Sequence, residues 1–329
     1  MPVYLLVGLT SAVLALVLTP VIGRGSTRLG LVDAPGDRKV HTHPVPRLGG
    51  VALVLAAILA LLLVMVVDQS ALDPLLWPTM RPFVIAVGLI FMVGLFDDVR
   101  GVGPVPKLFF EFAAAAVIMS SGLLIERITL LGWTWNLGWV AWPVTAAWLV
   151  GLTNAFNLID GVDGLAAGIA VLAGSACCAI LIARGHSPEA MLLAAMVGSA
   201  IGFLCFNFAP ASIFLGDSGS LVIGFVLAAT AITGWQKGAT ALAAGVPLMI
   251  FALPIVDSAL ALIRRGTARP SAGRSIGAIL HQIAQPDREH IHHRLLAMGW
   301  SVRQIVLVLY AITFVLSVLA LATADVSPP

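Results

Sequence analysis

The sequence predicts an all-α polytopic membrane protein with about ten transmembrane helices, both termini outside, and its chemical groups on the cytoplasmic face. Three observations support this fold class: an apolar composition, a series of apolar windows, and acidic motifs at alternate window ends. Hydrophobic residues make up 60% of the chain and charged residues 10%, and the mean hydropathy is +1.03. Because a soluble domain carries about 25% charged residues, this chain cannot cover a water-facing surface.

Apolar windows with short connections fill most of the 329 residues, so we expect a single integral membrane domain over residues 1–329. One helix needs ~20 apolar residues to cross a hydrocarbon core about 30 Å thick. The first window has no Lys or Arg before it and no small-residue cleavage pattern, which favours a retained helix over a signal peptide. The expected helices cover residues 3–23, 48–67, 82–96, 107–124, 140–158, 165–183, 190–208, 219–234, 240–263 and 302–324.

Basic residues indicate the orientation of these helices. Most Lys and Arg residues lie in, or at the edges of, the segments that follow the odd-numbered windows, and the opposite side has only Arg81, Arg127, Arg184 and Lys237. Positive charge marks the cytoplasmic side, so both termini should face outward. The net charge of +2 is spread over loops, which gives no reason to expect a nucleic-acid partner.

Five carboxylates fall at the ends of odd-numbered windows and should therefore gather on one membrane face. Asp97 and Asp98 lie in GLFDDVRG, Asp160 and Asp163 in NAFNLIDGVDGLA, and Asp217 in FNFAPASIFLGDSGS. Any one of them could be a helix cap, but adjacent carboxylates repel one another unless a cation offsets the cost. Hard cations prefer oxygen ligands, and Mg²⁺ usually shares them with phosphates. The pattern therefore predicts a Mg²⁺ site that handles phosphate.

A histidine group follows in PDREHIHHRL, in the last large inner loop. His290, His292 and His293 do not suggest zinc, because no cysteine or second histidine cluster lies nearby to complete the ligand set. A donor-rich loop close to phosphate or sugar fits them better, since Arg288 and Arg294 flank the group.

At these motifs the sequence resembles the polyprenyl-phosphate N-acetylhexosamine-1-phosphate transferases. Five segments recur in the family's order, and the HIHHRL form is similar to the GlcNAc-1-phosphate branch. One departure is the stretch IGAILHQIAQ before Pro286, which is longer than the usual spacing. The segments are DAPGDRKVHTHPVPRLGG (33–50), GLFDDVRG (94–101), NAFNLIDGVDGLA (154–166), FNFAPASIFLGDSGS (206–220) and PDREHIHHRL (286–295).

The resemblance implies an enzyme of the bacterial inner (cytoplasmic) membrane. Such an enzyme transfers N-acetylhexosamine-1-phosphate, in the first place GlcNAc-1-phosphate, from a UDP-sugar to undecaprenyl phosphate. UMP is released, and the product starts a cell-envelope glycan. The implied cofactor is Mg²⁺, with Mn²⁺ as the alternative, and a homodimer within the lipid is the implied assembly.

The resemblance also implies roles for individual residues. Asp217 matches the principal metal ligand, and Asp97 and Asp98 match the pair beside the lipid phosphate. Asn157, Asp160 and Asp163 would line the nucleotide and diphosphate site. Asn207 matches a polar position of the family, and Phe214 matches a position where an aromatic ring stacks on uracil or simply packs in the core. Contacts to phosphate or sugar are implied for His290, His292 and His293, with Arg294 as their charge partner. Lys39 would attract anionic substrate.

Three alternatives stay open on the sequence. Within the family, the chain could be a phospho-MurNAc-pentapeptide translocase, or it could take another UDP-N-acetylhexosamine. From a different class, a membrane transporter would also carry ionisable groups among apolar helices, although transporter sites lie near the bilayer midplane on broken helices.

Overall fold

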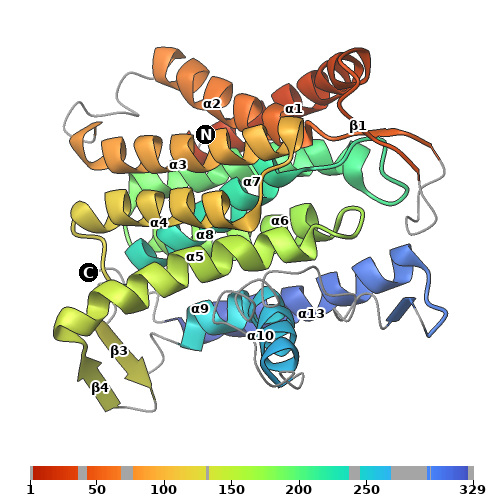
Figure 1. Cartoon of the computed structure of the whole chain (residues 1–329). Coiled ribbons are helices and arrows are strands. Elements are labelled where there is room, and N and C mark those ends of the chain that lie inside the picture. Colours follow the sequence, from red (N-terminus) through yellow and green to blue (C-terminus); the bar gives the residue numbers. More distant parts are fainter. Residues whose placement is uncertain are drawn as a thin grey trace.

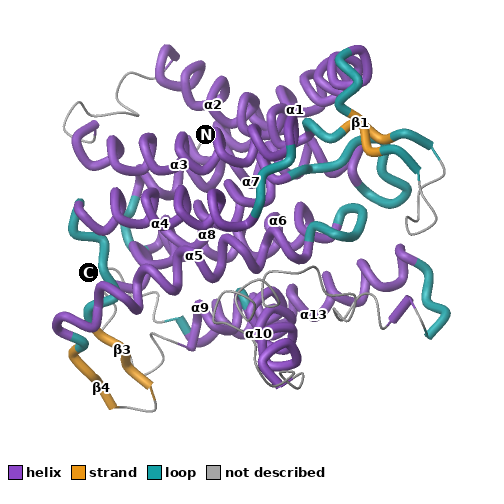
Figure 2. Tube along the Cα trace, in the orientation of Figure 1, coloured by secondary structure: helices purple, strands orange, loops and turns teal. Residues whose placement is uncertain are grey.

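The computed structural model describes residues 3–35, 43–67, 77–130, 133–236, 245–267, 295–296 and 298–324. Most of the described residues are helical, and the helices pack into one bundle (Figures 1 and 2). The helices are α1 (Val3–Arg28), α2 (Gly49–Val67), α3 (Trp77–Arg100), α4 (Pro104–Ser120), α5 (Ala141–Ile159), α6 (Leu165–Ala183), α7 (Ser187–Asn207), α8 (Asp217–Gln236), α9 (Gly245–Ile250), α10 (Ala252–Thr267) and α13 (Val302–Thr323).

Seven of the described helices are long and apolar enough to cross a membrane: α1, α2, α3, α6, α7, α8 and α13. Their outward faces carry large apolar side chains such as Leu9, Val17 and Phe314, which a bilayer would cover. The chain is thus a polytopic helical membrane protein, as the apolar composition predicted.

Helix α8 forms the centre of the bundle, because 94% of its most apolar stretch is buried. Helices α2, α3, α5, α6 and α7 all pack against it. Small residues allow this kind of close packing between apolar helices. On the far side of α7, for example, a Cβ on Gly198 would lie 2.0 Å from the carbonyl oxygen of Gly8 in α1.

The single helix expected over residues 240–263 is instead two helices, α9 and α10, with Phe251 between them. The Phe251 N–H still donates to the Pro247 carbonyl at 3.0 Å, and the Ile255 N–H to the Phe251 carbonyl at 3.1 Å. Pro254 has no N–H to give to the Ile250 carbonyl, and its ring crowds that turn. This proline explains the break.

Two short antiparallel hairpins lie at opposite ends of the bundle (Figure 1). Strands β1 (Val32–Asp33) and β2 (Val45–Pro46) pair beyond the C-terminal end of α1, with Val32 opposite Pro46. Strands β3 (Arg127–Leu130) and β4 (Trp133–Asn136) pair at the other end. Exposed tryptophans gather around β4 and the start of α5, as in the aromatic belt of a membrane interface.

Candidate active site

The candidate site is built around the first turn of α8, and a side chain from α3 holds that turn in place. Asp98 is 8% exposed, and both of its carboxylate oxygens accept hydrogen bonds from α8. The Asp217 N–H donates to Oδ1 at 2.8 Å, the Ser218 N–H to Oδ2 at 3.0 Å and the Ser218 hydroxyl to Oδ2 at 2.5 Å. Free N–H groups at a helix N-terminus favour a carboxylate. Asp98 therefore caps α8 from a neighbouring helix.

Glycines let two other helices approach this turn closely. A Cβ on Gly94 of α3 would lie 2.6 Å from the Asp217 carbonyl oxygen. A Cβ on Gly50 of α2 would lie 2.1 Å from the Gly219 nitrogen. The loop before α8 is also tied to α2, since the Gly50 N–H donates to the Leu215 carbonyl at 2.7 Å. The predicted motifs around residues 50, 94 and 217 thus meet at one point.

The Asp217 side chain is held by one cation and one amide. The Lys107 ammonium of α4 donates to Oδ2 at 2.7 Å, and the Asn157 amide of α5 donates to Oδ1 at 2.9 Å. The same amide lies 2.9 Å from the Ser220 hydroxyl. Asp217 thus joins α4, α5 and α8.

Asp97 faces the same cation. Its Oδ2 lies 3.5 Å from the Lys107 ammonium, and its Oδ1 accepts the Val102 N–H at 2.6 Å. Sequence reasoning treated Lys107 only as an orientation charge at the edge of a loop. The structure brings it between the Asp97 and Asp217 carboxylates.

Asp160 follows α5 and is partly buried beside the other carboxylates. Burial raises its pKa well above the usual value, and the negative charges of Asp217, Asp98 and Asp163 raise it further. The Gly216 N–H donates to this carboxylate and offsets part of the effect. Carboxylates crowded in this way favour a cation among them.

Asp163 and Asn207 brace the loop that leads into α8. The Asp163 carboxylate accepts the Ala211 N–H at 2.9 Å. Asn207, at 3% exposure, accepts the Gly164 N–H at 3.1 Å and donates to the Ile213 carbonyl at 3.0 Å. The Asn207 amide, expected to be a substrate contact, is thus occupied by backbone groups in this structure.

Phe214 lies in the same loop and is half-buried. Its N–H donates to the Pro46 carbonyl at 2.8 Å, and its carbonyl accepts the Gly49 N–H at 3.0 Å. These two bonds hold the loop against β2 and the start of α2. Five predicted site residues lie outside the described residues, namely Lys39, His290, His292, His293 and Arg294.

A second polar contact joins α4 and α5 one turn below Lys107. The Glu111 carboxylate accepts a hydrogen bond from the Asn154 amide, and Glu111 is 1% exposed. Sequence reasoning missed this pair as well. The signal was an ionisable residue within an apolar span, which marks a functional candidate by default.

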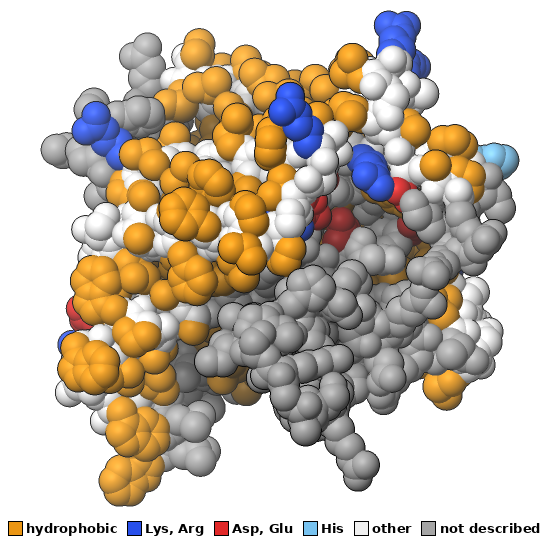
Figure 3. Space-filling view, in the orientation of Figure 1, with side chains coloured by type: hydrophobic (Ala, Val, Ile, Leu, Met, Phe, Trp, Pro, Cys, Tyr) orange, Lys and Arg blue, Asp and Glu red, His pale blue; other side chains and the backbone are white. Residues whose placement is uncertain are grey.

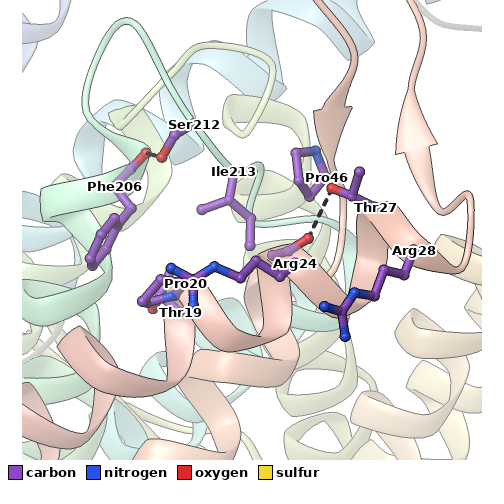
Figure 4. A pocket seen from close by; sticks show the side chains of 10 residues that line it. Thr19, Pro20, Arg24, Thr27, Arg28, Pro46, Phe206, Ser212 and Ile213 are labelled. Carbon is purple, nitrogen blue, oxygen red and sulfur yellow. Dashed lines mark hydrogen bonds between the residues drawn. The ribbon is translucent and has the colours of Figure 1, made fainter.

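Acidic side chains lie recessed in a hollow of the face shown in Figure 3, with basic side chains beside them. A separate groove of about 510 Å³ opens along the C-terminal turns of α1 (Figure 4). Arg24, Arg28 and Phe206 are among its lining residues, and none of the lining residues is acidic. The candidate site is therefore the carboxylate cluster, which this groove does not include.

The carboxylates fit a divalent cation that is shared with a phosphorylated ligand. The part of the chain that the structure describes contains no group of three or more His, Cys, Asp or Glu side chains placed to hold a metal ion. Mg²⁺ usually takes only one or two carboxylates together with substrate phosphates. The Asp217 and Asp97 carboxylates lie on either side of the Lys107 ammonium. Two carboxylates around one positive charge match the number that Mg²⁺ usually takes from a protein.

Comparison with known proteins shows similarity over the site and over most of the chain. The model of glycosyl transferase family 4 matches residues 80–235, which span the site from α3 to α8. A probable undecaprenyl-phosphate N-acetylglucosaminyl 1-phosphate transferase of Bacillus subtilis is 35% identical over 317 residues, covering 95% of this chain and 83% of that protein. A decaprenyl-phosphate N-acetylglucosaminephosphotransferase of Mycobacterium tuberculosis is 33% identical over 338 residues, covering 93% and 78%.

A phospho-N-acetylmuramoyl-pentapeptide-transferase of Synechocystis is 34% identical over 264 residues, covering 74% of this chain and 68% of that protein. Both branches considered from the motifs are therefore represented among the relatives. The identities and coverage of the Bacillus and Mycobacterium proteins extend the similarity over nearly the whole chain. This chain belongs to glycosyl transferase family 4 and is a membrane-embedded enzyme, as its motifs predicted.

Proposed function

We propose that this enzyme transfers GlcNAc-1-phosphate from UDP-GlcNAc to undecaprenyl phosphate and releases UMP. The relatives from Bacillus and Mycobacterium are named as transferases that join this sugar phosphate to a polyprenyl phosphate. The observation that carries the proposal is the convergence of Asp97, Asp217 and Lys107. Such a site suits a reaction in which phosphate charge must be positioned and neutralised.

In the proposed reaction an oxygen of undecaprenyl phosphate attacks the sugar-bearing phosphorus of the UDP-sugar. The bond from that phosphorus to the bridging oxygen breaks, and the bridging oxygen leaves as part of UMP. One phosphoanhydride replaces another. The attacking phosphate has a second pKa near 6, so much of it is already ionised at neutral pH.

Lys107 would neutralise phosphate oxygens, because its ammonium is the positive charge that lies beside both Asp97 and Asp217. Asn157 would keep Asp217 oriented through the Oδ1 contact. Of the adjacent acids, Asp97 is the one we place beside the lipid phosphate, since both Asp98 oxygens are engaged by α8. His290, His292, His293, Arg294 and Lys39 remain predicted contacts for phosphate or sugar, and Phe214 for uracil.

Mg²⁺, with Mn²⁺ as a substitute, would be held by Asp217 and Asp97 and would stabilise negative charge on the departing phosphate. Chelation should therefore abolish UMP release, and added Mg²⁺ should restore it. Full activity in excess chelator, after exhaustive removal of divalent cations, would contradict the metal proposal.

The test of function is UMP release by the purified protein with undecaprenyl phosphate, Mg²⁺ and a panel of UDP-sugars. We expect release that depends on the lipid phosphate and is lost in Asp217→Asn. UDP-GlcNAc as the preferred donor supports the GlcNAc branch. Preference for UDP-MurNAc-pentapeptide would instead indicate the translocase that the Synechocystis relative represents. Preference for a third UDP-N-acetylhexosamine would keep the reaction and change the sugar.

A transporter would place its carboxylates near the middle of the bundle. Here they gather at the ends of α3 and α5 and the start of α8, which favours a site open to one side. Release of no UMP with any donor, together with solute uptake that needs Asp217, would restore the transporter alternative.

We also propose a topology of ten crossings in the bacterial cytoplasmic membrane. Helices α4, α5 and the α9–α10 pair would add three crossings to the seven found by length and hydropathy. The distribution of basic residues supports a topology with both termini outside and the carboxylates on the cytoplasmic face. A homodimer within the lipid completes the proposal.

A further inference from the structure

Glu111 is a buried carboxyl group for which the proposed reaction has no use. It lies in the apolar helix α4 at 1% exposure, and its Oε1 has no hydrogen-bond partner among the described residues. An unpartnered buried oxygen disfavours folding, and ionisable groups inside apolar spans are retained mainly for function. An apolar side chain of similar size would serve packing better at this position.

The position of Glu111 connects it to the site. Glu111 follows Lys107 by four residues on α4, and Asn154 precedes Asn157 by three residues on α5. Side chains three or four apart share a helix face. The Glu111–Asn154 hydrogen bond thus lies one turn below the bridge in which Lys107 and Asn157 hold Asp217.

The lower contact is also oriented by the helix itself. The Asn154 amide donates to the Val150 carbonyl at 2.9 Å as well as to Glu111, so both of its hydrogens are used and its rotation is restricted. In low-dielectric surroundings such a hydrogen bond is stronger than in water. It therefore fixes the spacing of α4 and α5 directly beneath the site.

We propose that Glu111 is a positioning residue, which acts through Asn154 to hold Lys107 and Asn157 on the two oxygens of Asp217. The inference rests on the proposed function, because it concerns how the same site binds its divalent cation and reacts. Without the brace, α4 and α5 shift relative to one another and Asp217 loses its fixed orientation. Cation affinity and turnover should then fall together, with fold stability unaffected.

Three variants of the full-length protein test this. Glu111→Gln keeps an acceptor for the Asn154 amide. The double variant Glu111→Leu/Asn154→Leu removes the whole contact and leaves no orphaned polar partner. Thr230→Val is the matched control, since Thr230 is buried in α8 and its hydroxyl, among the described residues, bonds only the Val226 and Leu227 carbonyls of its own helix.

The measurements are thermal unfolding, Mn²⁺ affinity by electron paramagnetic resonance without substrates, and kcat and KM for UMP release. For the double-leucine variant we expect an unchanged or raised Tm, Mn²⁺ binding weakened roughly tenfold or more, and kcat lowered by a similar factor, as for other groups that support a metal ligand. Glu111→Gln should stay within about threefold of the wild type, because the brace persists. Thr230→Val should match the wild type in Mn²⁺ affinity.

The proposal is overturned if the double-leucine variant binds Mn²⁺ and turns over like the wild type. It is also overturned if that variant only lowers Tm, because the contact is then structural. Wild-type protein that binds no Mn²⁺ would refute it as well. Wild-type protein that binds Mn²⁺ but releases no UMP would refute the proposed function alone, and the Mn²⁺ titration would still decide the role of Glu111.

Discussion

Adjacent aspartates at the end of α3 have different surroundings, and this difference assigns them different tasks. Asp98 accepts three hydrogen bonds from the first turn of α8, whereas Asp97 accepts one backbone N–H and faces Lys107. Replacing Asp98 with Asn would present an NH₂ group to donors. We expect Asp98→Asn to lower the free energy of unfolding by about 1–3 kcal/mol, measured as a lowered Tm.

Asp97→Asn is the counterpart of that experiment. Its amide oxygen can still accept the Val102 N–H, so Tm should change little. The lost charge faces Lys107, so UMP release should fall. Equal loss of stability in Asp97→Asn and Asp98→Asn would contradict the division of tasks between the two residues.

Lys107 supplies the positive charge that meets Asp217 and Asp97. We expect Lys107→Gln to lower kcat/KM for UMP release roughly 100-fold, the order found when one charge-stabilising donor is removed. Lys107→Arg keeps the charge with a different geometry and should recover part of the rate. Wild-type kcat/KM in Lys107→Gln would exclude Lys107 from the reaction.

At the scale of elements, the close approach of α3 to α8 depends on Gly94, which has no Cβ. A Cβ on Gly94 would meet the Asp217 carbonyl, whereas a Cβ on Gly88 of the same helix would meet nothing within 4 Å. We expect Gly94→Ala to lower the free energy of unfolding by about 1–3 kcal/mol and to reduce UMP release. Gly88→Ala should be neutral or slightly stabilising, because alanine favours the helix. Comparing the Tm of Gly94→Ala with that of Gly88→Ala separates steric crowding against α8 from the general effect of placing alanine in a helix.

Most elements could be predicted from the sequence, because a helix that faces lipid or an apolar core needs a long apolar window. The window 165–183 coincides with α6 (Leu165–Ala183). The break at Phe251 could have been inferred from Pro254. The residues around it are apolar throughout, however, so hydropathy alone predicted one continuous helix. The two hairpins were missed. Strands β1 and β2 are only two residues long and have no readable alternation, and β3 and β4, at four residues each, are also short.

The candidate site was predictable only as far as its motifs. Asp217, Asp97 and Asn157 lie in recognisable segments, and the structure brings them to one place. Lys107, Glu111 and Asn154 depend on the rotation of α4 and α5 about their axes, which packing against other helices determines. A pattern along one helix cannot show that Lys107 will meet a residue 110 positions away.

For the whole molecule, orientation in the membrane is the testable property. The β3–β4 end should face outward, and the loop before α8 should face the cytoplasm. In a variant with Cys205 replaced by Ser, a membrane-impermeant maleimide should label Trp139→Cys on intact cells. Ser212→Cys should react only after permeabilisation. Both Trp139 and Ser212 are exposed, so the reverse pattern of labelling would invert the proposed topology.

The cap that Asp98 places on α8 has a consequence for how phosphate can bind. Many nucleotide-binding folds hold phosphate directly at a helix N-terminus, but two backbone N–H groups at this pole already bind a carboxylate of the protein. In the proposed reaction a diphosphate would therefore rely on the Lys107 ammonium and on a dissociable cation. Binding of the donor and release of the product would then depend on binding and dissociation of that cation. The cellular concentration of divalent ions would therefore limit the rate of the enzyme.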